Sequence, residues 1–299
     1  MTIFVVGATG YIAGAVIQKL QAAGHQVLGQ TRSAEKAKAL EALGVTPLVG
    51  DLTDAELLAS GVAASQAVIS LADSDSLPLA QGLISAMAQS GKTLIHTSGS
   101  SIVVDDARGA FASDATFDDD APFTPMDHRL PRVAVDRAIR LAGIEQGLRT
   151  AVICPTMVYG QGPGVHGVSD QIPKIAAKSL ERGAGVYVGQ GQNIWSNVHV
   201  DDLADLFLLA LERAPSGAFF FAENGEASLK SVAEAVSRQL GLDGRTESWD
   251  LAEAEAELGP WPRVALATNC RVRATNARRA LGWTPRGPAL QDAVLVTRA

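Results

Sequence analysis

The sequence predicts an α/β protein that is built on a doubly wound parallel sheet and followed by a smaller C-terminal α/β domain. Two observations lead to this fold class. Short apolar runs alternate with helical stretches five times before residue 100, a pattern typical of a parallel sheet with helices on both faces. The first run passes directly into a glycine-rich turn and a helix, which in such sheets marks a ligand site at the carboxyl ends of the strands.

The first element is the apolar run 3–6, which suits a strand that is buried on both faces. Gly7, Gly10 and Ala13 follow it, and the helix that comes next ends at Gly24. A turn without side chains lets backbone N–H groups approach a pyrophosphate, and the helix dipole stabilises that anion. We therefore expect a dinucleotide cofactor, with contacts from Gly7, Thr9, Gly10, Tyr11 and Ile12.

The second strand, 25–30, ends where the choice between NAD and NADP is made. An NAD site has a carboxylate here for the ribose 2′-hydroxyl, whereas an NADP site needs cations for the 2′-phosphate. Thr31 stands in place of the acid, and Arg32 can bind a phosphate in bidentate fashion with Ser33 beside it. The sequence thus favours NADP over NAD. In the structural alternative, Arg32 is only a solvated residue at a helix start.

Three further strands are predicted at 45–49, 67–71 and 92–96, with a helix at 79–89 between the last two. Their carboxyl ends should lie beside the cofactor. Asp51 could accept from the adenine amino group or cap the helix 54–60, a position for which Thr53 competes. The other contacts expected from these strand ends are Leu52, Leu71, Ala72 and Thr97.

The second half begins with a sixth strand at 150–154, after which Pro155 and Val158 are expected to form a wall against the nicotinamide. The Gly/Pro-rich segment 161–167 predicts a mobile loop over the substrate. Asp201 or Asp202 can cap the next helix. Helices are predicted at 203–213, 228–240, 251–258 and 274–281.

Composition narrows the class of protein. A net charge of −7 disfavours nucleic acid and anionic membranes as partners. Cys154 and Cys270 are too few for a disulfide framework or a metal site, which favours a reducing compartment. The chain starts directly in a strand, and no apolar run reaches membrane-spanning length. We therefore expect a cytoplasmic protein with a small-molecule substrate and no metal.

Six short motifs sharpen this interpretation: GATGYIAG at 7–14, GDL at 50–52, TSGSS at 97–101, PTMVYGQG at 155–162, VHVDDLA at 198–204 and LGWTP at 281–285. With them the sequence resembles the extended short-chain dehydrogenase/reductase family, which includes NAD-dependent epimerases and dehydratases. The resemblance implies a Rossmann domain at 1–158, to which 196–213 returns, and a substrate domain at 159–195 and 214–299. It also implies a homodimer formed through the helices at 79–89 and 131–141.

The family's catalytic Tyr-x-x-x-Lys pair is missing, because none of the three tyrosines is followed by a lysine four residues later. By spacing, His128 stands for the tyrosine, Arg132 for the lysine and Asp136 for an acid that often follows. In the functional interpretation, His128 exchanges the proton and Arg132 binds the cofactor ribose. In the structural alternative, Arg132 and Asp136 form an i,i+4 ion pair on a helix surface. Pro131 suits a first helical turn and would leave His128 just outside the helix.

The family also places a catalytic Ser or Thr after its fifth strand, and more than one residue of this chain can correspond to it. A gapless count gives Gly99, with Ser98 and Ser100 on either side. We assign Ser100 to polarising a carbonyl and Ser98 to contacting the substrate. Alternatively, these hydroxyls bond only to the loop backbone.

Family members that act on nucleotide sugars usually carry a diphosphate-binding arginine just before the V-H-V segment, where this chain has Trp195 and Ser196. The loss of that cation points to a smaller or apolar substrate, aromatic ones included, that Trp195 contacts. Alternatively, Trp195 only packs the domain interface.

The sequence therefore predicts an NADP(H)-dependent oxidoreductase for a small carbonyl or alcohol, with Ser100, His128 and Arg132 in the reacting shell. A nucleotide-sugar epimerase or dehydratase is the second hypothesis. The third is a non-catalytic NADP-binding redox sensor, which the missing Tyr-x-x-x-Lys pair would allow.

Overall fold

The structure is a computed structural model that describes residues 1–296. Its strands are β1 (Thr2–Val6), β2 (Gln26–Thr31), β3 (Thr46–Val49), β4 (Ala67–Ser70), β5 (Thr93–Thr97), β6 (Phe117–Asp118), β7 (Arg149–Pro155), β8 (Met157–Tyr159), β9 (Gly185–Val188), β10 (Ile194–His199), β11 (Ala218–Ala222), β12 (Glu226–Ser228), β13 (Thr246–Trp249) and β14 (Val272–Arg273). Its helices are α1 (Tyr11–Ala22), α2 (Ala34–Ala42), α3 (Ala55–Ala63), α4 (Leu77–Met87), α5 (Leu130–Glu145), α6 (Gln171–Arg182), α7 (Val200–Arg213), α8 (Leu229–Leu240), α9 (Leu251–Leu258), α10 (Trp261–Ala265) and α11 (Thr275–Leu281), with 3-10 turns η1 (Ser100–Val103) and η2 (Asp127–Arg129).

Seven parallel strands form the central sheet in the order β11-β7-β5-β4-β1-β2-β3, which confirms the predicted doubly wound class. The six strands expected from the sequence all belong to it. Because β1 pairs with β2 on one side and β4 on the other, the strand order reverses at β1. The glycine turn therefore lies at the switch point, where such sheets bind ligands.

The seventh strand, β11, comes from the segment 214–299 that we had assigned to the substrate domain. It pairs with β7 through five residues, from Ala218 opposite Ala151 to Ala222 opposite Pro155. The structure thus places this part of the segment in the large sheet. The residues of this strand, AFFFA, form an apolar, β-prone run, from which a strand could have been predicted in the sequence.

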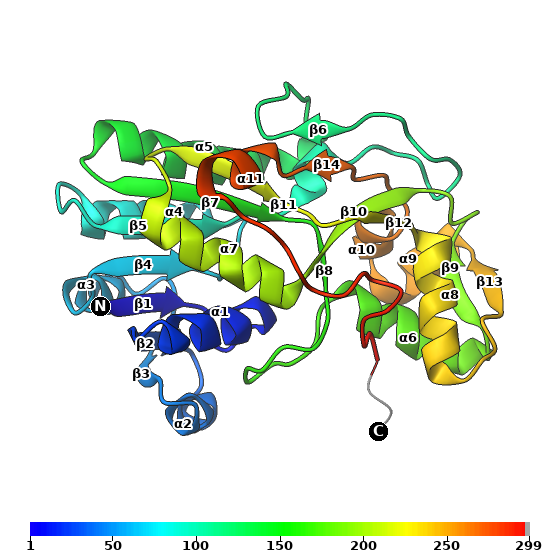
Figure 1. Ribbon diagram of the computed structural model, residues 1–299, viewed down its shortest axis with the longest axis horizontal. Helices are drawn as coiled ribbons and strands as arrows, with labels where there is room; N and C mark the ends of the chain where they lie inside the picture. The colour runs from blue at the N-terminus through cyan, green and yellow to red at the C-terminus, as the bar shows by residue number, and fades with distance from the viewer. Residues whose placement is uncertain (297–299) are drawn as a thin grey trace.

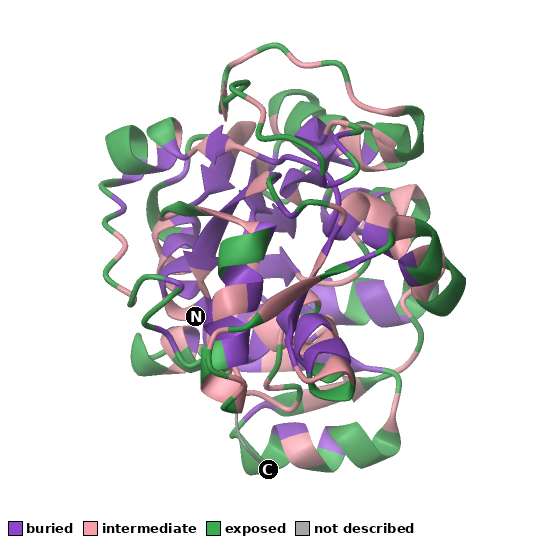
Figure 2. Cartoon of the chain, turned by 90° about the vertical axis from the view of Figure 1, so that its right-hand side faces the viewer, coloured by how far each residue is buried: buried purple, intermediate pink, exposed green. Residues whose placement is uncertain are grey.

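Helices cover both faces of the sheet, and the alternate side chains of β1 face two separate cores. Ile3 and Val5 pack into the core that contains α1 and α7, whereas Phe4 and Val6 pack into the core of α3, α4 and α5. All four side chains are fully buried, as expected for a strand between two helical layers. Figure 2 shows this buried interior between partly exposed outer helices.

Two helix starts differ from the sequence interpretation. Asp54 caps α3 by accepting from the N–H groups of Glu56 and Leu57, while Asp51 accepts from Thr53 outside the helix. His199, rather than Asp201 or Asp202, caps α7, because its Nδ1 lies 3.3 Å from the Asp201 nitrogen. A side chain can cap a helix only if it points back to the first turn, which the residue type alone does not fix.

The smaller domain lies beside the carboxyl edge of the sheet (Figure 1). There α6 and α8 pack against each other and against β9, which pairs in parallel with β13. A three-stranded sheet of β8, β10 and β12 joins the two parts, since β8 follows β7 and β10 leads into α7.

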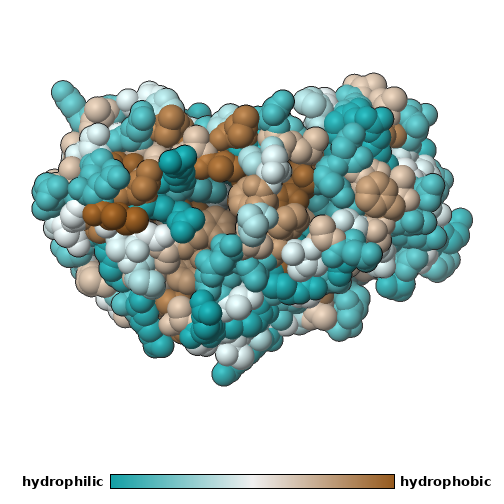
Figure 3. Space-filling model, turned by 90° about the horizontal axis from the view of Figure 1, so that it is seen from above, coloured by the Kyte–Doolittle hydropathy of each residue, from teal (hydrophilic) through white to brown (hydrophobic). Residues whose placement is uncertain are grey.

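Part of the outer surface is apolar. Leu141 and Ile144 of α5 are exposed, and Figure 3 shows hydrophobic patches on the upper side of the molecule, where α5 lies in Figure 1. The homodimer through α4 and α5 stays a prediction. Within residues 1–296, none of the helices combines the length and the apolar character that a bilayer crossing requires.

Candidate active site

The glycine turn after β1 is shaped for close contact with an anion. Gly7 has a φ of +78°, and a Cβ atom there would lie 3.0 Å from the Ala72 nitrogen. Gly10 precedes α1 and supplies no side-chain cap, so the first N–H groups of that helix are left for a ligand. Gln30, which the sequence interpretation missed, ties the turn to the sheet, because it accepts from the Gly7 N–H (3.1 Å) and donates to the Gly50 carbonyl (2.7 Å).

The end of β2 carries the residues from which the sequence predicts a 2′-phosphate site, and that site stays a prediction. Thr31 is buried and Arg32 is exposed. Ser33 caps α2 by accepting from the Lys36 N–H at 3.2 Å, which leaves its hydroxyl hydrogen free to donate. The Thr53 hydrogen bonds and the nearby Arg32 charge lower the pKa of Asp51, so this carboxylate is ionised at neutral pH.

A cavity of about 620 Å³ opens between the glycine turn, the ends of the sheet and the smaller domain. It brings together nine of the residues chosen from the sequence: Gly10, Tyr11, Ile12, Leu71, Ser100, Arg132, Pro155, Val158 and Trp195. Lining residues that the sequence interpretation missed include Asp75, Arg129, His166, Gln171 and Trp261.

The other chosen residues do not line this cavity: Gly7, Thr9, Thr31, Arg32, Ser33, Asp51, Leu52, Ala72, Thr97, Ser98 and His128. Those at the ends of β2 and β3 lie on the far side of the glycine turn, where an adenosine would extend. Their role in cofactor binding stays a prediction.

Arg132 is held rigidly at the cavity wall. Its Nε and Nη2 donate to the two carboxylate oxygens of Asp75 (3.0 and 2.8 Å), and its Nη1 donates to the Ser101 hydroxyl (2.9 Å). A Cβ atom at position 99 would come within 2.7 Å of Nη1, so the glycine there gives the guanidinium its room. The ion pair that the structural alternative assigned to Arg132 and Asp136 is therefore wrong, because Asp75 is the partner.

Asp136 is instead buried in the core, where the Ser98 hydroxyl donates to its Oδ2 at 2.7 Å. Burial raises the pKa of Asp136 to about 7. Ser98 thus points away from the cavity, and the structure does not bring it to the position expected for a substrate contact. The neighbouring Thr97 Oγ1 is buried without a hydrogen-bond partner.

Of the two serines chosen from the sequence, Ser98 and Ser100, Ser100 is the one that lines the cavity. It begins η1, and its Oγ accepts from the Cys270 thiol at 3.1 Å. Because its acceptor side is occupied in this way, the hydroxyl hydrogen can be donated to a ligand oxygen. The placement fits the carbonyl-polarising role chosen for Ser100.

His128 lies in η2, outside the first turn of α5, and its side chain is exposed. Partial burial and the Arg129 charge lower its pKa. The structure does not bring His128 together with Ser100 in the cavity wall, so its role as acid or base stays a prediction. The neighbouring residue, Arg129, faces the cavity instead.

Aromatic side chains from the smaller domain close the opposite wall. Trp195 has only 5% of its surface exposed, and its Nε1 donates to the Thr268 carbonyl at 2.7 Å. Trp195 therefore packs the domain interface, as the alternative interpretation expected. It also lines the cavity, where a substrate contact stays a prediction. Trp261, from α10, lines the cavity as well.

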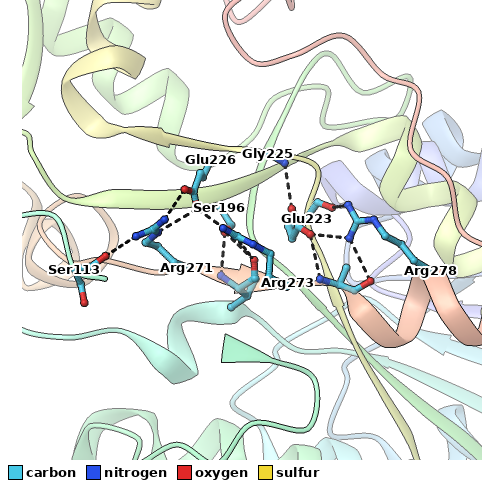
Figure 4. A network of polar contacts seen from close by, with 10 residues as sticks. Ser113, Ser196, Glu223, Gly225, Glu226, Arg271, Arg273 and Arg278 are labelled. Carbon is cyan, nitrogen blue, oxygen red and sulfur yellow. Dashed lines mark hydrogen bonds and ion pairs between the residues drawn. The ribbon is translucent and has the colours of Figure 1, made fainter. Parts of the chain in front are cut away.

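The strand that carries Trp195 is fixed by a polar network (Figure 4). The hydroxyl of Ser196 bonds to the backbone N–H and C=O of Val272. Beside it, Arg271 and Arg273 donate to Glu226. This network holds β10 against β14 and so keeps the aromatic wall in place.

The segment predicted to be a loop over the substrate lies against α1. The Gly162 N–H donates to the Gly167 carbonyl at 2.9 Å. A Cβ atom at Gly14 would lie 2.4 Å from the Gly164 Cα, so the loop backbone touches the helix. His166, in the same loop, lines the cavity.

Comparisons with known proteins agree with this architecture. The model of the NAD dependent epimerase/dehydratase family matches residues 3–220. The oxidase ucsJ of an Acremonium species is 34% identical, over 96% of this chain and 94% of its own length. A 4-hydroxy-2-methyl-3-oxo-4-farnesyl-3,4-dihydroquinoline-1-oxide ketoreductase of Stigmatella aurantiaca is 27% identical, over 92% of this chain and 84% of that protein. The structure of dTDP-glucose 4,6-dehydratase from Bacillus anthracis in complex with NAD has a TM-score of 0.78 at 16% identity, covering 98% of this chain and 95% of its own.

Proposed function

Because the chain belongs to the NAD-dependent epimerase/dehydratase family, we propose that it is an NADP(H)-dependent oxidoreductase that transfers a hydride to or from a small carbonyl or alcohol, aromatic ones included. The observation that carries this proposal is the single cavity in which the glycine turn, Ser100, Arg132 and the two tryptophans meet. Relatives that are named as an oxidase and a ketoreductase support redox chemistry.

The residues present fit a nicotinamide dinucleotide. Unsatisfied N–H groups at the start of α1 can hold its pyrophosphate, and Pro155 and Val158 provide an apolar wall for its ring. Arg32 and Ser33, with no carboxylate at Thr31, favour the 2′-phosphate of NADP. When bound, the cofactor supplies or accepts the hydride.

The chain's own residues then act on the substrate oxygen. Ser100 can donate a hydrogen bond to a carbonyl at the position its hydroxyl faces, which stabilises the negative charge that grows on the oxygen during reduction. Arg132, fixed by Asp75 and Ser101, adds a positive charge nearby and can hold ribose hydroxyls. Trp195 and Trp261 offer apolar surface to the body of the substrate and exclude water from that side.

The substrate proposed here is not a nucleotide sugar. A diphosphate is best bound by a cation with two parallel donors, and at the start of β10 the chain offers Trp195 instead. The indole is nearly buried and bonded to the backbone, so it cannot make way for a diphosphate without breaking that contact.

The proposal is tested by titrating the purified protein with NADPH and NADH and then following NADPH absorbance with a panel of small aldehydes and ketones. We expect NADPH to bind at least about tenfold more tightly than NADH, as one charge-assisted contact gives, and to be oxidised by some of the carbonyls. Tight binding without turnover on any of them would favour the redox sensor. Retention of bound oxidised cofactor through purification would favour an epimerase or dehydratase.

A further inference from the structure

Arg129 is a cavity residue to which the proposed mechanism gives no task. It ends η2, directly before α5, and it precedes Arg132 by one helical turn. Its Nε is buried without a hydrogen-bond partner, and within residues 1–296 its guanidinium forms no ion pair or hydrogen bond. Burial and the charge of Arg132 lower its pKa. The side chain is half-buried at the cavity wall, and a cation with a buried, unpaired nitrogen is costly, so its presence calls for an explanation.

The other charged groups of the cavity wall are neutralised. Arg132 is paired with Asp75 through two hydrogen bonds, and Asp170 is paired with Lys174 on α6. Among the described lining residues, Arg129 therefore contributes the one unbalanced full charge. The cavity is locally positive, although the protein as a whole carries a net charge of −7.

Arg129 and Ser100 line the same cavity. The Cys270 thiol donates to the Ser100 hydroxyl at 3.1 Å, which leaves the hydroxyl hydrogen for a ligand. The aromatic wall of Trp195 and Trp261 belongs to the same cavity. A ligand that uses all of these groups needs an oxygen for the serine, a negative charge for the arginine and an apolar body.

We propose that Arg129 binds a carboxylate of the substrate, so that the substrate is a carbonyl compound with one carboxylate and an aromatic or apolar body. A guanidinium offers two parallel donors that match the two oxygens of a carboxylate. One free positive charge suits a monoanion, whereas a diphosphate would bring more negative charge than the cavity can balance. This inference rests on the proposed function for the identity of the reacting group.

A binding experiment tests it without requiring turnover. Benzoate and the neutral benzamide are titrated by calorimetry into the NADP⁺-saturated protein. We expect benzoate to bind at least about tenfold more tightly, as a charge-assisted hydrogen bond warrants. In Arg129→Met the preference should fall to less than about twofold. The matched control is Arg137→Met, because Arg137 is exposed on α5, the helix that follows Arg129, and does not line the cavity; it should keep the preference.

Three results would overturn the inference: equal binding of the two probes to the unaltered protein, a benzoate preference that persists in Arg129→Met, or loss of NADP⁺ binding in that variant, which would assign the arginine to the cofactor. If Arg129→Met does not fold, Arg129→Lys replaces it, and the preference should fall severalfold because a lysine cannot bind a carboxylate in bidentate fashion. An unchanged preference in Arg129→Lys would then count against the inference.

A kinetic comparison separates this inference from the proposed function. Phenylglyoxylate and acetophenone are offered with NADPH, and we expect the acid to have the higher kcat/KM, by about tenfold or more, with the advantage lost in Arg129→Met. If neither ketone oxidises NADPH while benzoate still binds through Arg129, the hydride-transfer proposal fails and the carboxylate site stands. If both ketones are turned over at equal kcat/KM, the hydride-transfer proposal stands and the carboxylate site fails.

Discussion

Arginines occur in two opposite settings in this protein. In the network of Figure 4, Arg271 and Arg273 are paired with Glu226, and Arg278 is paired with the buried Glu223. At the cavity, Arg132 is paired in the same way with Asp75, but Arg129 has no partner among the described residues. The paired arginines account for structure, whereas the unpaired one keeps guanidinium donors in the cavity wall that can bind a ligand.

Asp136 is a second ionisable side chain without an ion pair among the described residues, and in this case the group is a buried acid. Its pKa rises from 3.8 to about 7 on folding, so the folded state binds the proton more tightly than the unfolded chain. The stability that this proton contributes is present below about pH 4 and is lost as the pH rises through 7. Between pH 4 and 8 we expect the unfolding free energy to fall by about 4 kcal/mol relative to Asp136→Asn. Urea unfolding of both proteins across this range measures the difference; parallel stability curves would contradict it.

The two kinds of arginine should respond differently when a charge is removed. Glu223 accepts from the N–H groups of Gly225 and Ala274 and from Arg278, at 3.2, 3.1 and 2.7 Å. Glu223→Ala should lower the unfolding free energy by about 3 kcal/mol, because partners of a buried charge are left unpaired. Arg129→Met should cause no loss beyond about 0.5 kcal/mol, since no protein contact is broken. Equal losses in urea unfolding would remove the distinction between the two settings.

Ser100 lines the same cavity as Arg129, and its substitution tests whether the cavity has a catalytic role. If its hydroxyl stabilises the charge on the substrate oxygen, Ser100→Ala should lower kcat about 100-fold, the range found for one lost oxyanion donor. The dissociation constant of NADPH should change by less than about threefold, because the residue is not assigned to the cofactor. A kcat within about threefold of the unaltered protein would show that another group carries this role.

His128 should give the smallest effect. It is adjacent to Arg129, but its side chain is exposed and does not line the cavity. From this exposed position we expect His128→Ala to change kcat/KM by less than about threefold, which is the opposite of the acid or base role that the sequence predicts for this residue. A loss of about 100-fold or more, with a shifted pH optimum, would restore the histidine as the replacement for the family's tyrosine.

The part of the cavity wall formed by the glycine turn could be predicted because its signals are local. A strand, a glycine turn and a helix in direct succession place Gly10, Tyr11 and Ile12 on the cavity wall wherever the rest of the chain goes. The same locality identified the six strands that precede the smaller domain.

The substrate half depends on how distant segments meet. Trp261 is more than 60 residues from Trp195 in sequence, and only the packed smaller domain shows that both line the cavity. Spacing from the family pattern selected His128, whereas the turn at η2 directs the next residue, Arg129, into the cavity. A shift of one residue at a helix start changes which side chain faces the site, and sequence spacing cannot resolve it.

The most direct measurement follows a deuterium atom. NADPH labelled at C4 with deuterium in either the 4R or the 4S position is mixed with the protein and a ketone that it reduces, and the alcohol is analysed by mass spectrometry. We expect one of the two labelled cofactors to deliver its deuterium to the carbinol carbon, while the oxygen takes its proton from water. Reduction with the label retained in the oxidised cofactor from both forms, or lost to water, would contradict direct hydride transfer in this cavity.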